Sequence, residues 1–140
     1  ARIMESVLYG DKFSVNGNDY PTHDGTCVRD YVHVSDIARA NVDALEMLWQ
    51  YGGCESMNLG AGKGYSVLDI IKAVEEVLNT QVVYDIKPKR AGDATANFAS
   101  IDHAQNMIGF SAKYNLEDMI RTALAWYQSD IYKQIRNTHG

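Results

Sequence analysis

The sequence contains little of what marks several large protein classes. Its 140 residues include only two cysteines and two prolines. Cys27 and Cys54 have neither metal-ligand spacing nor a C-x-x-C arrangement, so we expect reduced thiols, although one disulfide between them stays open. No apolar run reaches the roughly 18 residues that a membrane span requires. No signal-peptide pattern opens the chain, and we therefore expect a cytoplasmic protein.

Positive charge is also scarce. The chain has 13 Lys and Arg against 18 Asp and Glu, for a formal net charge of −5. A protein that binds nucleic acid through the phosphate backbone needs a sustained basic excess, so we exclude that class and keep only local sites for a small anion. The four histidines lack H-x-x-x-H spacing and a carboxylate at ligand spacing, which predicts no metal site. His33, inside an apolar-polar alternation, is expected to be a structural histidine.

Two catalytic patterns are missing as well. No serine lies in a G-x-S-x-G motif, so nucleophilic hydrolysis has no support. Nine tyrosines are present, but none is followed by a lysine four residues later. The sequence thus contains no Tyr-x-x-x-Lys pair.

Hydrophobic periodicity predicts short strands that alternate with helices. Strands are expected at 13–15, 28–34, 57–59 and 81–86. A helix is expected before Gly10, and others are expected to begin at caps formed by Ser35, Ser66, Ser100 and Asn115. The tail after Ser129 is polar and is expected to fray. This order predicts one α/β domain over residues 1–140, with helices packed on a small sheet.

The opening of the chain carries a further expectation. Ala1 is followed at once by an amphipathic helical pattern that has no N-cap. This pattern favours a truncated chain over a chain whose initiator Met was removed, and both alternatives stay open.

A glycine loop, Gly60 to Gly64, stands between a predicted strand and a predicted helix. Backbone N–H groups in that setting can hold a phosphate, and Asp85 follows at about the distance of a ribose-binding carboxylate. However, the run reads G-x-G-x-G rather than the G-x-G-x-x-G of dinucleotide sites. We interpret it as a tight turn with positive φ before a capped helix, and we do not expect NAD binding by this chain.

Two other segments combine cations with a carboxylate. Residues 87–93 contain three basic side chains, a proline, a glycine and Asp93, and Arg29 is followed by Asp30 and Tyr31. A guanidinium suits phosphate oxygens, and a carboxylate can accept hydrogen bonds from sugar hydroxyls. A ribose carrying a diphosphate would use both groups, whereas the simpler alternative is a solvated loop with a surface ion pair.

These segments together resemble UDP-glucose 4-epimerases of the extended short-chain dehydrogenase/reductase superfamily. The resemblance rests on sequence blocks that occur in order over nearly the whole chain. These blocks are G-N-D-Y-P-T at 17–22, D-G-T-C-V-R-D-Y-V-H-V at 24–34, N-L-G-A-G at 58–62, G-Y-S-V-L at 64–68, K-R-A-G-D at 89–93 and L-E-D-M at 116–119, with Trp126. It implies the carboxy-terminal, UDP-sugar-binding part of an NAD(P)-binding Rossmann-type epimerase.

The resemblance implies a role for each matching position. Arg29 and Arg90 would hold the diphosphate, and Asp93 would bind the ribose hydroxyls. Ser14 to Asn16 would meet the uracil through backbone groups. The implied substrate-binding set is Ser14, Val15, Asn16, Arg29, Tyr31, Val67, Arg90, Asp93 and Asn97.

The family reaction interconverts UDP-glucose and UDP-galactose. A hydride passes from sugar C4 to NAD and returns to the other face, which needs an NAD fingerprint and a Tyr-x-x-x-Lys pair. Both belong to the family's amino-terminal domain, and this sequence has neither, so the chain alone is expected to be inactive. The intact enzyme is expected to be a homodimer. A stand-alone UDP-sugar-binding module and a related UDP-sugar epimerase or decarboxylase remain alternatives.

Asn97 stands where the family varies between a bulky tyrosine and a small residue. That position limits whether an N-acetyl group fits beside the sugar. Because Asn is smaller than Tyr, the resemblance leaves interconversion of N-acetylated UDP-sugars open.

Overall fold

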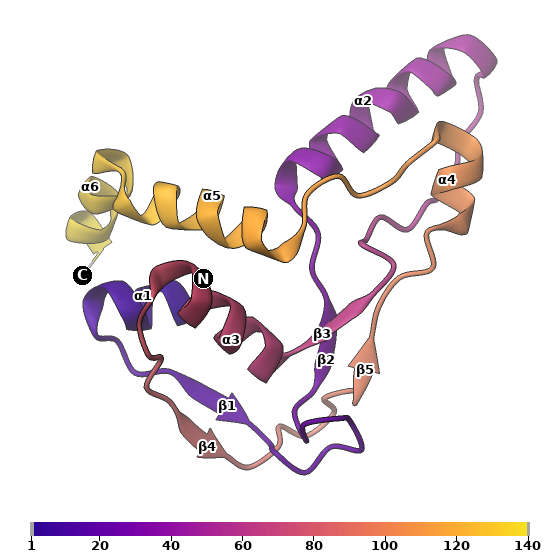
Figure 1. Ribbon diagram of the computed structural model, residues 1–140. Helices are drawn as coiled ribbons and strands as arrows, with labels where there is room; N and C mark the ends of the chain where they lie inside the picture. The colour runs from indigo at the N-terminus through magenta and orange to yellow at the C-terminus, as the bar shows by residue number, and fades with distance from the viewer. Residues whose placement is uncertain (1, 140) are drawn as a thin grey trace.

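The computed structural model describes residues 2–139 and shows a mixed α/β chain (Figure 1). The elements are, in order, α1 (Arg2–Tyr9), β1 (Ser14–Asn16), β2 (Val28–Asp30), α2 (Val34–Tyr51), β3 (Gly64–Ser66), α3 (Val67–Leu78), β4 (Asp85–Lys87), β5 (Ala96–Asn97), α4 (Asp102–Ile108), α5 (Leu116–Gln128) and α6 (Asp130–His139). None of the helices in this range is long and apolar enough to cross a membrane.

The strands of residues 2–139 form two small sheets rather than the single sheet expected. β1 pairs with β4 in parallel, with Val15 opposite Ile86. β2 lies at the centre of the other sheet, antiparallel to β3 and parallel to β5. Figure 1 shows the β1–β4 pair beside α1 and α3, whereas β2, β3 and β5 lead towards α2 and α4.

The larger apolar core joins α1, β1, α3 and α5. The helices contribute apolar side chains at helical spacing, and strand β1 contributes Val15, which is 1% exposed. Val74 on α3 is completely buried, and Ile120 on α5 is 5% exposed. The core therefore contains residues from both the beginning and the end of the chain.

A smaller core lies between α2 and α4. It is formed by Ala40, Ala104 and Phe110, all no more than 1% exposed. Asp36 at the start of α2 is fully buried, accepts the backbone N–H groups of Lys113 and Tyr114, and pairs with Arg39 at 2.9 Å. The carboxylate thus fastens α2 to the segment that leads into α5.

Several sequence predictions agree with the structure. The helix before Gly10 forms, and Ser66 and Asn115 each complete a capping box, with Asp69 and Asp118. Cys27 and Cys54 are both unpaired thiols in the described part of the chain.

The strand expected at 13–15 forms as β1, shifted by one residue, whereas the other strand predictions were too long or wrong. β2 stops at Asp30, because the next three residues lead into the cap of α2. Residues 57–59 do not form a strand, and of 81–86 only the last two residues are in β4. Val82 donates its N–H to Glu75 Oε1 instead of to a neighbouring strand, at 2.9 Å.

Two predicted caps and the predicted fraying were also wrong. His33, not Ser35, caps α2, because its Nδ1 accepts the N–H of Ser35. Ile101 precedes α4, while Ser100 donates its hydroxyl to Asp102. The tail forms α6, where the Tyr132 ring packs on Tyr127 and its hydroxyl donates to Glu5.

Candidate functional site

A cavity of about 260 Å³ lies where β1, β2, the start of α3 and the β4–β5 loop meet. Eight of the nine residues predicted from the sequence line it: Ser14, Val15, Asn16, Arg29, Tyr31, Val67, Arg90 and Asp93. These side chains come from segments far apart in the chain. The two small sheets bring the segments together, because β1 pairs with β4 and β2 pairs with β5 on either side of the same loop.

Arg29 is held rigidly at the cavity wall. One of its guanidinium nitrogens, Nη1, donates to the carbonyl oxygens of Val28 and Ala94, each at 2.8 Å. The other, Nη2, lies 3.6 Å from Asp93 Oδ1, and the Arg29 side chain is 29% exposed. The backbone therefore fixes the direction of the guanidinium while part of its surface stays accessible to a ligand.

Arg90 is the second cation in the cavity. Within residues 2–139 its side chain makes no hydrogen bond or ion pair, although it lines the cavity with Arg29. A guanidinium with five donors and no protein partner can bind an anion without first breaking an internal contact. The cavity thus offers one anchored and one free guanidinium.

Tyr31 gives the cavity a neutral hydroxyl. Burial raises the pKa of its phenol above the ordinary 10.0, the nearby Cys27 thiol raises it further, and Arg29 partly offsets both. The phenol therefore stays protonated at neutral pH and can donate a hydrogen bond. Asp93 stands opposite as an acceptor, with a side chain that is 30% exposed.

Strand β1 presents backbone groups to the cavity. It has β4 as its strand partner on one side, and no other strand among residues 2–139 pairs with it. Its three residues all line the cavity. Backbone N–H and C=O groups on the unpaired side of β1 are therefore available to a ligand.

Asn97 is the one predicted residue outside this cavity. It lies in β5 in register with Arg29, and it lines a neighbouring cavity together with Asn58, Phe98 and Ser100. Arg29 lines both cavities. The structure thus places Asn97 next to the predicted set, on the far side of Arg29.

The D-G-T segment at 24–26 fastens the preceding loop to α3. The Thr26 hydroxyl is buried, donates to Asp24 Oδ1 at 2.8 Å and accepts the N–H of Val67 at 3.1 Å. Gly25 has φ +83°, and a β-carbon there would overlap the carbonyl of Asn18. The motif therefore positions Val67 and the strand that carries Arg29.

The glycine loop packs against Asp30 instead of forming an open phosphate cradle. Asp30 accepts the N–H of Ala61 at 2.9 Å and that of Ala99 at 3.1 Å. A β-carbon at Gly60 would overlap this carboxylate, and Gly62 has φ +69°. Because a carboxylate already binds the loop, these residues do not fit a dinucleotide phosphate.

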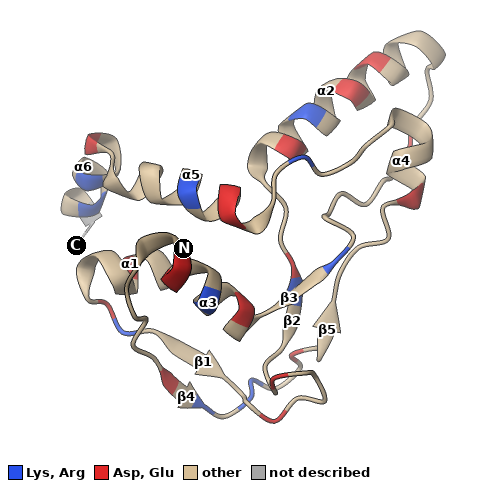
Figure 2. Cartoon of the chain, in the orientation of Figure 1, with Lys and Arg blue, Asp and Glu red and all other residues tan. Residues whose placement is uncertain are grey.

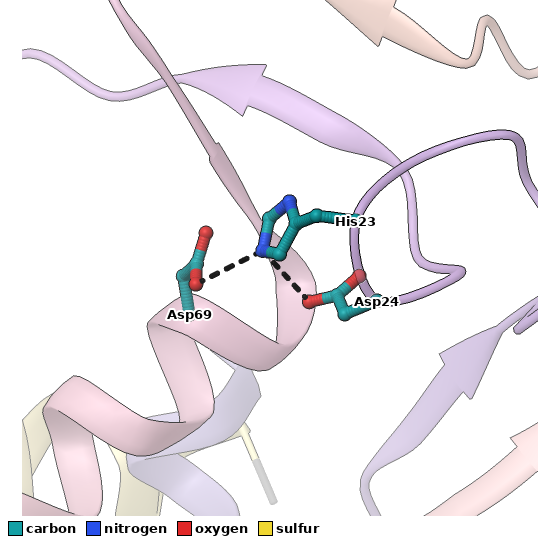
Figure 3. Close-up of side chains that lie close together, drawn as sticks. All are labelled: His23, Asp24 and Asp69. Carbon is teal, nitrogen blue, oxygen red and sulfur yellow. Dashed lines mark hydrogen bonds and ion pairs between the residues drawn. The ribbon is translucent and has the colours of Figure 1, made fainter.

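Sequence reasoning missed three cavity residues and one cluster. Arg2, Phe13 and Cys27 also line the cavity. Strand alternation could have indicated Cys27, since it precedes Arg29 by two residues on the same face. The expectation that the histidines lack carboxylate partners was wrong, because His23 lies beside Asp24 and Asp69 (Figure 3).

Comparisons with known proteins identify homologues. No protein-family model matches the chain. UDP-glucose 4-epimerase from Bacillus subtilis (strain 168) is 44% identical over 121 residues, which are 86% of this chain and 36% of that protein. The solved UDP-glucose 4-epimerase of Stenotrophomonas maltophila, with bound NAD and formylated UDP-arabinopyranose, is 41% identical with a TM-score of 0.86, over 89% of this chain and 37% of the other.

A second solved structure is also similar to this chain. UDP-glucose 4-epimerase from Bifidobacterium longum, in complex with NAD⁺ and UDP, is 36% identical with a TM-score of 0.82 and covers 92% of this chain and 38% of its own. The chain thus spans about a third of the length of these relatives. The resemblance seen in the sequence is confirmed: the homologues of this chain are UDP-glucose 4-epimerases, and the chain aligns with about a third of their length.

Proposed function

We propose that this chain binds the nucleotide part of a UDP-sugar, as the carboxy-terminal, substrate-binding part of a UDP-glucose 4-epimerase. The observation that carries the proposal is one cavity that Arg29, Arg90 and Asp93 line together with β1, a strand that has a strand partner on one side only among residues 2–139. Relatives whose structures hold UDP or a UDP-sugar share its fold.

The charges fit a nucleoside diphosphate. Two guanidiniums match two phosphates, because each presents a planar set of N–H donors to phosphate oxygens. Arg90 has no competing partner in the described chain, whereas Arg29 would exchange its long contact with Asp93 for a phosphate. Asp93, released from Arg29, would accept hydrogen bonds from the two ribose hydroxyls.

The remaining lining fits a base. Uracil presents both a donor and acceptors along one edge, as the backbone of an unpaired strand does. Residues Ser14 to Asn16 supply such a backbone, and the apolar side chains of Phe13 and Val67 border it. Tyr31 and Val67 would thus complete the wall of the nucleotide site.

Epimerisation is proposed only for a longer protein that also carries a coenzyme site. Structures of relatives hold NAD, which would accept and return the hydride at sugar C4. The loop at 60–64 does not fit NAD, because Asp30 binds it. We therefore assign this chain the orientation of the UDP-sugar and no step of hydride transfer.

Asn97 bears on the choice of sugar. It lines the second cavity, which shares Arg29 with the proposed nucleotide site. An Asn occupies less space there than a Tyr would, so we propose that UDP-sugars with a 2-acetamido group are accepted. A whole enzyme with Asn97 that converts only the non-acetylated pair would contradict this.

Two wider assignments are proposals of the same kind. The whole enzyme is proposed to be a cytoplasmic homodimer. A stand-alone UDP-sugar-binding module and a related UDP-sugar epimerase or decarboxylase remain competing functions. Turnover of UDP-pentoses in preference to UDP-glucose by the longer protein would favour the last of these.

Thermal unfolding of this chain with UDP, followed by mass detection of bound coenzyme, tests the proposal. We expect UDP to raise the unfolding temperature in a saturable way, because it binds the folded state only. We expect no NAD to remain bound after purification. Uridine alone should stabilise the chain less than UDP, since it lacks the diphosphate. Equal stabilisation by uridine and UDP would contradict the roles of Arg29 and Arg90.

A further inference from the structure

A second group of side chains lies away from the proposed nucleotide cavity. Figure 3 shows His23 on the loop before β2, with Asp24 beside it and Asp69 in the first turn of α3. His23 Nε2 lies 3.5 Å from Asp24 Oδ2 and 3.4 Å from Asp69 Oδ1. All three ligating atoms lie within 4.8 Å of one another.

These distances suit a small coordination sphere. Zinc binds imidazole nitrogen and carboxylate oxygen at about 2.0–2.2 Å, so two ligands of a tetrahedral site stand about 3.3–3.6 Å apart. Both histidine-to-carboxylate distances fall in that range. One imidazole and two carboxylates are also ligand types that divalent transition metals accept.

The two carboxylates are held in place before any ion arrives. Asp24 Oδ1 accepts the N–H and the hydroxyl of Thr26, both at 2.8 Å, and its Oδ2 accepts the hydroxyl of Ser66. Asp69 Oδ2 accepts the N–H of Ser66 at 2.9 Å, which leaves Oδ1 directed to His23. Such outer hydrogen bonds orient metal ligands and raise affinity.

The local charge also favours a cation. Two carboxylates face a single imidazole in this cluster. Within residues 2–139, His23 is the only basic side chain that pairs with either carboxylate, and its side chain is 61% exposed. An ion can thus reach the cluster from solvent.

We propose that His23, Asp24 and Asp69 form a binding site for one divalent transition-metal cation, with Zn²⁺ as its probe. Water completes the coordination on the exposed side. The ion links the 16–27 loop to α3 across the 46 residues that separate His23 from Asp69. The three ligands are not among the residues that line the nucleotide cavity, so the role we assign to the ion is structural.

Titration calorimetry of Zn²⁺ into the chelator-treated chain tests the site. We expect one ion per chain, and His23→Gln should weaken binding by at least the roughly 10–100-fold that losing an outer-shell partner costs. His103→Gln is the matched control, because His103 faces a single carboxylate, Glu55, at 3.4 Å. It should leave the affinity unchanged.

Asp69→Asn provides an independent check. The amide oxygen can still accept the N–H of Ser66, so the fold is retained while one anionic ligand is lost. Zinc binding should weaken as in His23→Gln, and Co²⁺ should lose the strong visible absorption of a tetrahedral site. Zinc binding that is absent from the unmodified chain, or equal in His23→Gln and His103→Gln, would overturn the proposal.

Discussion

The region around the larger core and helix α2 differ in how much of their apolar surface is buried. Around α1, β1, α3 and α5, apolar side chains from distant parts of the chain share one core. Helix α2 instead extends away from that core (Figure 1) and exposes large apolar residues, with Leu45 at 63% and Trp49 at 90% exposure. Local stability follows buried apolar contact, so α2 should open before the core does.

The proposed nucleotide cavity lies with the packed region. Its β1 and α3 walls belong to elements of the larger core, and its other walls are β2 and the β4–β5 loop. Figure 2 shows both basic and acidic residues along the segment that joins β4 to β5. The proposed ligand site therefore lies in the more stable region. A rigid site lowers the entropy cost of binding.

The largest expected effect is a loss of unfolding free energy caused by a substitution in the larger core. Ile120→Ala should lower the free energy of unfolding by about 2–5 kcal/mol, because Ile120 is 5% exposed and its loss leaves a cavity. Leu45→Ala on α2 should change it by less than about 0.5 kcal/mol. Urea unfolding measures both, and equal losses would contradict the contrast between the two regions.

The next effect concerns the attachment of α2. Asp36→Ala removes the acceptor of the Lys113 and Tyr114 N–H groups and should cost about 1.5–3 kcal/mol. Hydrogen exchange should become faster in α2 while α3 stays protected. Glu46→Ala, at an exposed position of the same helix, is the control and should leave the exchange of α2 unchanged. Faster exchange throughout the chain would show that α2 is not a separate unit.

The smallest expected effect concerns α6, which packs against the larger core through Tyr132. Burial raises the pKa of Tyr132 above 10.0, and its hydrogen bond to Glu5 adds to this. The folded-state pKa exceeds the unfolded value, so this stabilisation is complete below about pH 10 and is lost as the pH rises through the folded pKa. The urea midpoint of Tyr132→Phe should therefore fall less steeply above pH 10 than that of the unchanged chain. Identical slopes would contradict this role.

How much of the fold could be predicted depends on how local its causes are. The caps at Ser66 and Asn115 were predictable, since each capping box is complete within four residues. The His33 cap was not, because the imidazole is also held by Thr122 Oγ1, 89 residues away. The strand at 81–86 failed for a similar reason, since Glu75 takes the N–H of Val82.

The candidate site shows the same limit. Residue chemistry and resemblance together indicated Arg29, Arg90 and Asp93, and the structure brings them to one cavity. No local pattern could show that Asp30 would bind the glycine loop, or that Asp69 would approach His23. Both contacts arise from tertiary packing that pattern analysis does not capture.

Titration calorimetry of UDP into this chain and its Arg90→Gln variant tests directly whether the cavity binds UDP through Arg90. Arg90 is the suitable position, because it lines the cavity without a partner in the described residues, so its replacement removes no internal contact. We predict that the variant loses about 1.5–3 kcal/mol of UDP binding free energy. Arg121→Gln, on the exposed face of α5, should lose none. Unchanged UDP affinity in Arg90→Gln would contradict the account.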